Sequence, residues 1–356
     1  MHGFAEAVPA RGPDPFPGLT ASPPLVSVII VNYNGVALLD DCLTSVFATD
    51  YHPLEVVLVD NGSTDGSAAF VRSRFPDVRL LVQEENLGFA GGNNRGVESS
   101  TGEYVVLLNT DTRVEPGWVN ALLELLQDPA VAVVTSRVVT EDVPERFYTK
   151  NGTLNFLGYN IMRVFDDLSL VFFAGGASLM FRKQIVGKPF LDEYFLYHED
   201  VYLSWRMRLA GYTIRMAQAS SVHHIGSVTA SRQASSLVTF YQERNRLLNA
   251  LLLFESSTLL RLLPLFLADG VVKLALSLVA GRKSPAGIIR AYVWCITHAR
   301  WILGQRHVHQ AKRTVRDREI LSWMSPRLLD HDGPLASTVN RCSQLYARLM
   351  RLPFYA

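Results

Sequence analysis

The sequence predicts an α/β fold in which a mostly parallel sheet carries helices on both faces and is followed by an α-helical C-terminal region. From Leu25 to about Ala217, short β-branched runs alternate with helical patterns, which is typical of a parallel sheet buried on both faces. From Glu243 onward the strand pattern is absent, and leucine-rich helical segments replace it.

Four strands and four helices are predicted at the start of the sheet region. The strands are expected at 26–31, 54–59, 78–82 and 104–109, and the helices at 36–48, 66–74, 90–99 and 116–126. Ligands of open α/β sheets bind at the carboxyl ends of the strands. The residues that follow each strand are therefore the first candidates for a site.

Each predicted strand is followed by carboxylates, amides or glycines. Any one such group has an ordinary interpretation as a turn or helix cap, but their joint placement predicts a single polar crevice. The residues are Asn32 and Tyr33 after the first strand, Asp60 and Asn61 after the second, Asn93 within the glycine-rich segment 86–96 after the third, and Asn109 and Asp111 after the fourth.

A nucleotide would suit the first two strand ends. Tyr33 can stack on a base, while Asp60 or Asn61 can hydrogen-bond its polar edge. The alternatives are a core aromatic for Tyr33 and an Asx turn for Asp60. The segment 86–96 lacks the GxGxxG pattern, which argues against a dinucleotide site.

Asn109 and Asp111 place two oxygen donors one residue apart at the end of an apolar strand. Such oxygens suit Mg²⁺ or Mn²⁺, which recruit substrate phosphates to complete their coordination. A structural turn is the alternative. His223 and His224 are adjacent, which suits a shared zinc site badly.

Glu199 and Asp200 precede a helical stretch that reads VYLSWRMRL. An acidic pair in a first turn is ordinarily a cap and a partner of the helix dipole. Here the pair also follows an aromatic run beside the predicted crevice, so one carboxylate could deprotonate an attacking hydroxyl.

Composition excludes several classes of protein. The 356 residues carry a net charge of +1, so no overall positive charge is available for nucleic acid. Three widely spaced cysteines form neither a disulfide framework nor a metal motif, which indicates a reducing compartment. Residues 1–24 hold six of the 17 prolines and no apolar signal core, so we expect a disordered leader.

The two halves of the chain differ in charge. Residues 241–356 hold 17 Lys and Arg against 7 Asp and Glu. Residues 255–280 predict a helix with a wide apolar face, which Pro264 could kink and in which Asp269 and Lys273 have the spacing of an ion pair. We expect residues 256–320 to hold the protein at an anionic membrane surface without spanning it. Packing on the catalytic domain or a homodimer interface is the alternative.

Eight segments resemble, in order, the family-2 inverting glycosyltransferases of the GT-A fold. They are VSVIIVNYNG (26–35), VLVDNGSTDGS (57–67), NLGFAGGNNRG (86–96), LLNTDTRVEPGW (107–118), FFAGGASLMFRK (172–183), HEDVYLSWR (198–206), VHHIGS (222–227) and YQERNRLLNALL (241–252). These segments are most similar to those of the bacterial rhamnosyltransferase branch, which builds cell-wall and surface polysaccharides. The resemblance covers roughly residues 25–255, and residues 285–324 more loosely.

The resemblance implies a role for each donor-side residue. Asp60 matches the aspartate that binds the nucleotide base, and Asn32 with Tyr33 lines the same pocket. Asn109 to Asp111 matches the DXD metal motif, with Asn in place of the first carboxylate, and this implies weaker metal binding. His224 matches a histidine near the metal or the diphosphate.

The remaining assignments concern the chemistry and the acceptor. Asp200 matches the general base, and Asn93 stands where relatives outside this branch often carry a diphosphate-binding arginine. The residues expected on the acceptor side are Glu199, Gly175, Gly176 and Ala177, although tight strand packing is the alternative for the last three. Residues 139–170 match none of the shared motifs and are expected to set specificity.

The resemblance implies an inverting hexosyltransferase that uses Mg²⁺ or Mn²⁺. The leading donor is dTDP-rhamnose and the leading acceptor a saccharide or a polyprenyl-linked saccharide, at the inner face of the plasma membrane. A nucleotidyltransferase and an inactive nucleotide-sugar-binding protein remain alternatives. The expected parts are a leader (1–24), a GT-A catalytic domain (25–240), a helical region (241–324) and a C-terminal tail (325–356).

Overall fold

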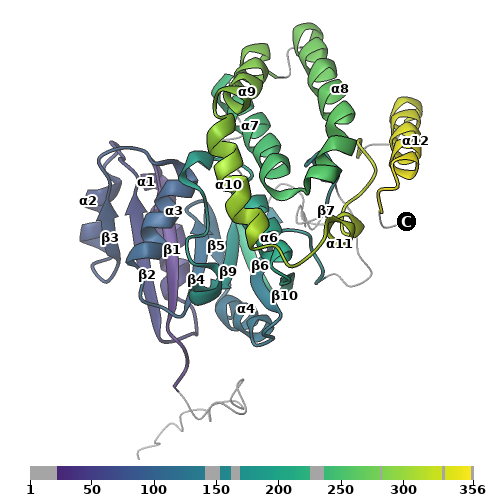
Figure 1. Cartoon of the computed structure of the whole chain (residues 1–356). Coiled ribbons are helices and arrows are strands. Elements are labelled where there is room, and N and C mark those ends of the chain that lie inside the picture. The colour runs from purple at the N-terminus through teal and green to yellow at the C-terminus, as the bar shows by residue number, and fades with distance from the viewer. Residues whose placement is uncertain are drawn as a thin grey trace, which may run out of the picture.

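The computed structural model describes residues 22–140, 153–161, 169–224, 236–280, 283–330 and 333–353. Most of the predicted leader and much of the segment 139–170 therefore lie outside the described residues. The described chain forms a sheet covered by helices, with a group of further helices to one side (Figure 1).

The central sheet has eight strands in the order β3-β2-β1-β4-β9-β6-β10-β5. Strands β9 and β5 run antiparallel to their neighbours and the other six run parallel, so the sheet is mostly parallel as predicted. The strands are β1 (Val26–Asn32), β2 (Leu54–Asp60), β3 (Arg79–Val82), β4 (Tyr104–Asn109), β5 (Thr112–Val114), β6 (Val131–Thr140), β9 (Ser178–Arg182) and β10 (Thr213–His224), and a separate hairpin joins β7 (Thr153–Leu154) to β8 (Asn160–Ile161).

Helices cover both faces of this sheet, because its strands are apolar on both sides. The helices of this part are α1 (Val36–Phe47), α2 (Ser67–Arg74), α3 (Gly88–Ser99), α4 (Trp118–Leu126), α5 (Lys183–Val186) and α6 (Glu199–Leu209), together with the 3₁₀ helix η1 (Asp192–Tyr194). One core contains residues of α1 and α4, and the other contains residues of α3 and α6. The four predicted strands and four predicted helices are confirmed, with shifts of at most two residues.

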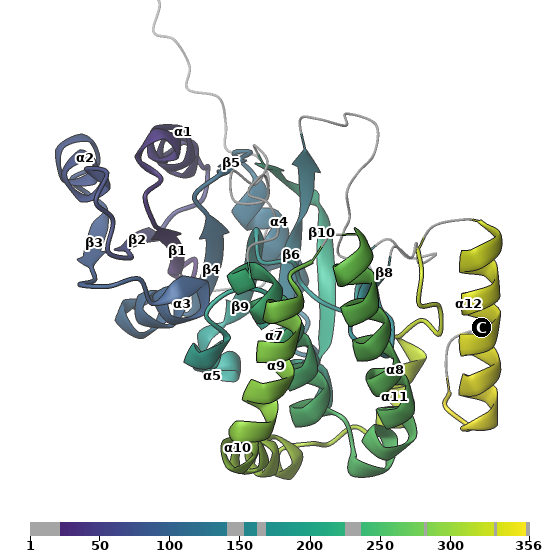
Figure 2. The same ribbon diagram turned by 90° about the horizontal axis from the view of Figure 1, so that it is seen from above.

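The C-terminal part is helical, as predicted. Its helices are α7 (Ser236–Leu253), α8 (Ser256–Ala280), α9 (Pro285–Thr297), α10 (Ala299–Ala311), α11 (Asp317–Ser322) and α12 (Pro334–Leu349). Helix α7 joins the core of the catalytic part, and α8 and α9 lie side by side beyond it (Figure 2). Pro264 does not interrupt α8, which continues through it.

The polarity of α8 is inverted relative to a helix of an ordinary soluble protein. Its charged residues Asp269 and Lys273 point inward and pair with each other at 3.2 Å, which their spacing predicts. Leu262 and Phe266 of α8 are buried, but most of its other apolar side chains are exposed, and Val279 is 88% exposed. Within the described residues, Ser256–Val279 is the one helix long and apolar enough to cross a membrane.

Candidate active site

The sheet register brings three predicted site residues to one edge. Asn32 at the end of β1 lies opposite Asp60 at the end of β2, and Asn109 ends β4 beside Val31. This edge includes the point where the strand order reverses, since β2 and β4 flank β1. These three residues therefore lie together at the edge of the sheet where the crevice is predicted.

The base-binding candidates have contrasting environments. The ring of Tyr33 is 53% exposed, which leaves a face free for stacking. Asp60 is buried, and one of its carboxylate oxygens accepts a hydrogen bond from the backbone N–H of Ser63 at 3.2 Å. The Asn32 amide donates to the Ser63 hydroxyl, so the loop after β2 is tied to the end of β1.

Asn61 ties the loop after β2 to the start of α3. Its amide donates to the side chain of Asn86 at 2.9 Å and to the carbonyl of Gly88 at 3.0 Å. Its own oxygen accepts from the backbone N–H of Leu87 at 3.0 Å. Because these bonds use both the nitrogen and the oxygen of the Asn61 side chain, Asn61 fixes the loop conformation beside the predicted crevice.

Asn93 lies on α3 and is almost completely buried. Its side chain donates to the carbonyl of Phe89 one turn earlier, at 2.9 Å. The Asn93 amide is therefore used within α3. It would act on a donor diphosphate only indirectly, by fixing the conformation of the first turns of the helix.

Asp111 and His224 meet although more than 100 residues separate them. The end of β10 pairs antiparallel with β5, and this pairing sets His224 opposite Thr112. The imidazole Nε2 then lies 3.2 Å from a carboxylate oxygen of Asp111. The amide oxygen of Asn109 is buried and makes no hydrogen bond within the described part of the chain.

Asp111, His224 and Asn109 have the donor types that a divalent cation binds, and the structure brings the first two of them together. A carboxylate, an imidazole and an unpaired amide oxygen supply donors for Mg²⁺ or Mn²⁺ but leave most of the coordination sphere to other ligands. Among the described residues no group of three His, Cys, Asp or Glu side chains is placed to hold a metal without such help.

The acidic pair stands at the start of α6 with two different exposures. Glu199 is buried, and one of its carboxylate oxygens has no partner among the residues described. Asp200 is half-buried and accepts hydrogen bonds from the backbone N–H of Val201 at 2.7 Å and of Gly176 at 3.2 Å. Of the two, Asp200 is the carboxylate that a substrate can reach.

Burial dominates the protonation of this pair. It raises the pKa of Glu199 well above 4.5, and the neighbouring Asp200 carboxylate adds to that shift. Burial also raises the pKa of Asp200 above 3.8, against the opposing effect of the two backbone hydrogen bonds. Two adjacent carboxyl groups with raised pKa values are typical of a site that moves protons.

The residues predicted on the acceptor side lie next to Asp200, the predicted general base. A side chain added at Gly176 would meet the Asp200 carboxylate at 3.7 Å, and Ala177 accepts the backbone N–H of Asn109 at 3.0 Å through its carbonyl. Gly175, Gly176 and Ala177 therefore connect the metal-side strand to the base. Ordinary van der Waals distances at Gly176 show that a methyl group would fit there.

The comparison with known proteins decides the family. Residues 27–188 match the family model for glycosyl transferase family 2. This segment contains every residue of the strand-end crevice except those contributed by α6 and β10. The chain carries a family-2 glycosyltransferase domain.

Relatives agree with this assignment. The glycosyltransferase is 28% identical over 253 residues to the N-acetylglucosaminyl-diphospho-decaprenol L-rhamnosyltransferase of Mycobacterium tuberculosis, over 61% of this chain and 82% of the relative. It is 27% identical to glycosyltransferase AglE of Haloferax volcanii, over 56% of this chain and 66% of that protein.

A solved structure supports the fold. GalNAc-T7, crystallised with UDP, GalNAc and Mn²⁺, superposes with a TM-score of 0.54 at 13% identity. The likeness covers 77% of this chain and 57% of that protein, so the chain spans little more than half of its length. The sheet of the glycosyltransferase has the GT-A arrangement.

Helix α7 positions the loop of residues 194–198, a role that the sequence did not predict. This loop directly precedes the acidic pair, and we call it the base loop after the general base predicted at Asp200. Three residues of the base loop, Phe195, Tyr197 and His198, have left-handed φ angles of 59°, 71° and 64°. Asn245, buried in α7, donates from its amide to the carbonyls of Tyr194, Leu196 and Tyr197 at 2.8, 2.9 and 2.7 Å. The sequence signal was the ERN triplet in a matching segment, which carried no assigned role.

The same loop is held from the other side by α3. The backbone N–H of Ala90 donates to the carbonyl of Phe195 at 3.1 Å, and Gly88 adopts a φ of +72° directly beneath that residue. A side chain at Gly88 would come within 2.4 Å of the Phe195 carbonyl oxygen. The first turn of α3 thus needs glycine for close packing against the base loop.

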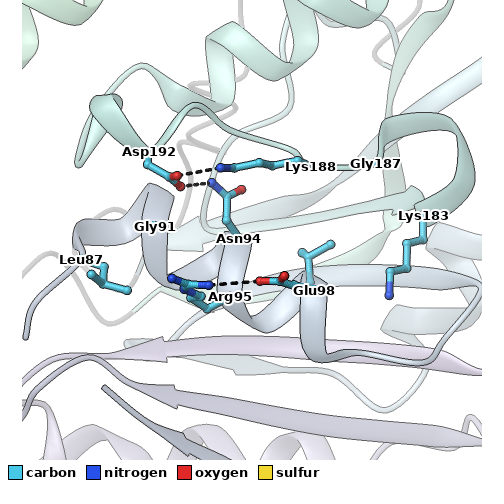
Figure 3. Close-up of a pocket in the computed structure, with 10 residues that line it drawn as sticks. Leu87, Gly91, Asn94, Arg95, Glu98, Lys183, Gly187, Lys188 and Asp192 are labelled. Carbon is cyan, nitrogen blue, oxygen red and sulfur yellow. Dashed lines mark hydrogen bonds and ion pairs between the residues drawn. The ribbon is translucent and has the colours of Figure 1, made fainter. Parts of the chain in front are cut away.

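A cavity of about 690 Å³ lies on the outer side of α3 (Figure 3). Four of its charged residues form two ion pairs, Lys188 with Asp192 at 2.6 Å and Arg95 with Glu98 at 3.3 Å, and Lys183 donates to the Ser100 carbonyl. Asn94 bonds to Asp192 at 2.7 Å and so attaches α3 to the segment before the base loop. The bonds around this cavity therefore hold α3 against residues 188–192 of the glycosyltransferase.

Proposed function

We propose that the chain is an inverting, metal-assisted hexosyltransferase that moves a sugar from a nucleoside diphosphate to an acceptor hydroxyl. The observation that carries the proposal is the crevice itself. One half presents Tyr33, Asp60 and the Asp111–His224 pair, and the other presents Asp200, a carboxylate with a raised pKa and open access.

In the proposed reaction Asp200 acts on the acceptor. Its carboxylate accepts the proton of the acceptor hydroxyl while that oxygen attacks the anomeric carbon. The bond between the anomeric carbon and the diphosphate oxygen breaks, and its electron pair leaves with the nucleoside diphosphate. Attack opposite the leaving group inverts the anomeric configuration.

The donor side holds the nucleotide in place. Tyr33 would stack on the base and Asp60 would accept a hydrogen bond from its edge. Asn109, Asp111 and His224 would hold a divalent cation against the diphosphate. Such a cation, when bound, neutralises the negative charge that develops on the departing group.

We propose a rhamnose donor, dTDP-rhamnose, and a polyprenyl-diphosphate-linked saccharide as the acceptor, for cell-wall or surface polysaccharide synthesis. The support is the likeness to the mycobacterial enzyme, whose name describes rhamnosyl transfer to N-acetylglucosaminyl-diphospho-decaprenol. A lipid-linked acceptor also suits the inverted polarity of α8.

We further propose that the C-terminal helices dock on the anionic inner face of the plasma membrane. Each of α8, α9 and α10 carries exposed apolar residues, which would form the docking surface: Leu260, Leu267, Val271, Leu278, Val279, Ile289, Val293, Ile296 and Leu303. Arg261, Arg290 and Arg300 are exposed on the same helices and would contribute about 1 kcal/mol each at an anionic bilayer. Burial of the apolar surface would supply the larger share.

Flotation tests the membrane assignment. The protein should float with vesicles that contain anionic lipid, and Val279→Glu should weaken this, because it places a charge in the docking surface. Val82→Glu, at an exposed apolar position of β3, is the matched control. Equal flotation of both variants and the wild type would exclude this surface, and a dimer that masks it would favour packing between copies.

The base assignment is tested by Asp200→Asn. The amide cannot accept the acceptor proton, so turnover should fall by roughly 10²–10⁴-fold while donor affinity stays within about twofold. Product analysis also separates the alternatives, since a nucleotidyltransferase would transfer the nucleotide and an inactive protein would transfer nothing. Near-normal turnover of the variant would return Asp200 to a helix-cap role.

A further inference from the structure

A cluster of five charged residues lies between α7, α8 and α9. We call it the Glu243 cluster, and its members are Glu243, Arg246, Asp269, Lys273 and Lys283. The Glu243 carboxylate accepts hydrogen bonds from three cations, Arg246 at 2.9 Å, Lys273 at 2.6 Å and Lys283 at 2.7 Å. Asp269 pairs with Arg246 at 2.9 Å and with Lys273 at 3.2 Å.

The Glu243 cluster has more positive than negative charge. Three cations share two carboxylates, so one positive charge is uncompensated within the cluster. A buried group of this kind is stabilised by an additional anion.

Lys283 is the member of the cluster that an anion can reach. Its side chain is 37% exposed, whereas Glu243 and Arg246 are 1% exposed. It immediately precedes Ser284, the N-cap of α9, whose backbone N–H donates to Thr239. An incoming anion would therefore meet Lys283 first, with Lys273 and Arg246 behind it.

The cluster adjoins the base loop. Burial, followed by the charges of Arg246 and Lys283, lowers the pKa of His198 to about 4, and His198 directly precedes the acidic pair. Asn249, one turn beyond Arg246 on α7, donates to the His198 carbonyl at 3.2 Å. Helix α7 therefore carries both two members of the cluster and a residue that bonds to the loop before Asp200.

An apolar surface begins where the cluster ends. Val272 precedes Lys273 on α8 and Leu276 follows it, and these two side chains are 54% and 58% exposed. Ile289 and Val293 on the adjoining α9 are also exposed. The two helices pack closely, since a side chain at Gly270 would come within 2.5 Å of the Tyr292 hydroxyl. A cationic head site therefore continues into an apolar track.

We propose that Lys283, supported by Lys273 and Arg246, binds the diphosphate of the polyprenyl-linked acceptor, whose tail lies along α8 and α9. This inference rests on the proposed function and adds the place where the lipid acceptor is recognised. The attacking hydroxyl and the diphosphate belong to one short saccharide, which requires a head site close to Asp200. The Glu243 cluster meets this requirement through its contact with the base loop.

The test is vesicle binding by the full chain, without any turnover. Neutral phosphatidylcholine vesicles that contain a few per cent polyprenyl diphosphate are compared with vesicles that contain the uncharged polyprenol. Binding should be stronger to the diphosphate vesicles. Lys283→Gln should reduce that difference roughly tenfold, because a charge-assisted contact is lost. Lys283→Arg should preserve it.

Arg72→Gln is the matched control, since it removes an exposed cation from α2, outside both the cluster and the proposed docking surface. It should leave the diphosphate-dependent binding intact. Equal losses in both variants would indicate general attraction to charge, and no loss in Lys283→Gln would indicate a purely structural cluster; either result overturns the inference. A variant that unfolds early in a thermal scan is replaced by Lys283→Met, which retains the aliphatic stem.

Kinetics separates this inference from the proposed function. Lys283→Gln should raise KM for the lipid-linked acceptor roughly tenfold and leave KM for the donor and for a short glycoside acceptor without diphosphate unchanged. A raised donor KM would assign the site to the nucleotide diphosphate and overturn the inference. Absence of transfer by the wild type to every acceptor would refute the proposed function, while the vesicle result would still decide the diphosphate site.

Discussion

Asn245→Ala should separate the positioning of the base from the binding of the donor. The Asn245 amide is completely buried and satisfies three carbonyls of the base loop, within a stretch that holds three left-handed residues. Alanine removes all of these bonds and offers no other donor. The loop would then relax, and Asp200 at its end would move.

The magnitude follows from the bonds that are lost. Two amide protons contribute about 1 kcal/mol each, and carbonyls left without a donor add about 1 kcal/mol or more. We expect the free energy of unfolding to fall by about 2–4 kcal/mol, which corresponds to a melting temperature lower by roughly 3–5 °C. A displacement of Asp200 by about 1 Å should lower kcat roughly 10²-fold.

Asn340→Ala provides a matched control. Asn340 lies on α12 and also makes three backbone hydrogen bonds, to the N–H groups of Leu328 and Leu329 and to the Leu329 carbonyl. Its replacement should cost similar stability and leave kcat unchanged. The assays are thermal unfolding, donor binding by calorimetry and initial rates of transfer. If Asn245→Ala loses stability but keeps the kcat of the control, Asn245 does not position the base.

Three further perturbations have defined outcomes. Glu199→Gln should raise the melting temperature at pH 8 and change it little at pH 4. Because the pKa of Glu199 is raised, the folded protein holds a proton that the unfolded chain releases above about pH 4.5, so this carboxyl group destabilises the fold at high pH and glutamine removes the cost. A lower melting temperature of the variant at pH 8 would contradict this reasoning. Chelation should abolish transfer, and Mg²⁺ or Mn²⁺ should restore it. Calorimetry should show weak metal binding until donor is added, because Asp111 is the one charged ligand in the proposed metal site, and tight metal binding to the donor-free protein would exclude this arrangement. Gly88→Ala should destabilise the protein by at least about 1 kcal/mol more than Gly66→Ala in urea unfolding, since both positions have positive φ but only Gly88 is closely packed; equal losses would remove the packing argument.

Local patterns were sufficient for the first half of the sheet. The runs 26–31 and 104–109 are β-branched, apolar throughout and followed by polar residues, so their type and ends follow from composition. Their register then aligned Asn32 with Asp60 without further information. Strand β9 was not predicted, because its residues, Ser178–Arg182, form a short run with no alternation and pair antiparallel with β4.

The long-range parts of the site could not be derived from local patterns. Asp111 and His224 meet because β10 turns back along β5, which depends on the whole sheet, and only the family resemblance suggested their proximity. Asn245 shows the same limit: a polar residue in a helix has many roles, and its three acceptors lie 48–51 residues earlier in the chain. The inward orientation of Asp269 likewise depends on Arg246 of another helix.

The most direct test of the central claim is a reaction of the purified full chain with individual nucleotide sugars and a polyprenyl-diphosphate-linked saccharide. Release of nucleoside diphosphate and the anomeric configuration of the product are measured together. The account predicts release with dTDP-rhamnose only when acceptor is present, a product whose anomeric configuration is opposite to that of the donor, and no product from Asp200→Asn. Transfer of the nucleotide, retention of configuration or an active Asp200→Asn variant would contradict it.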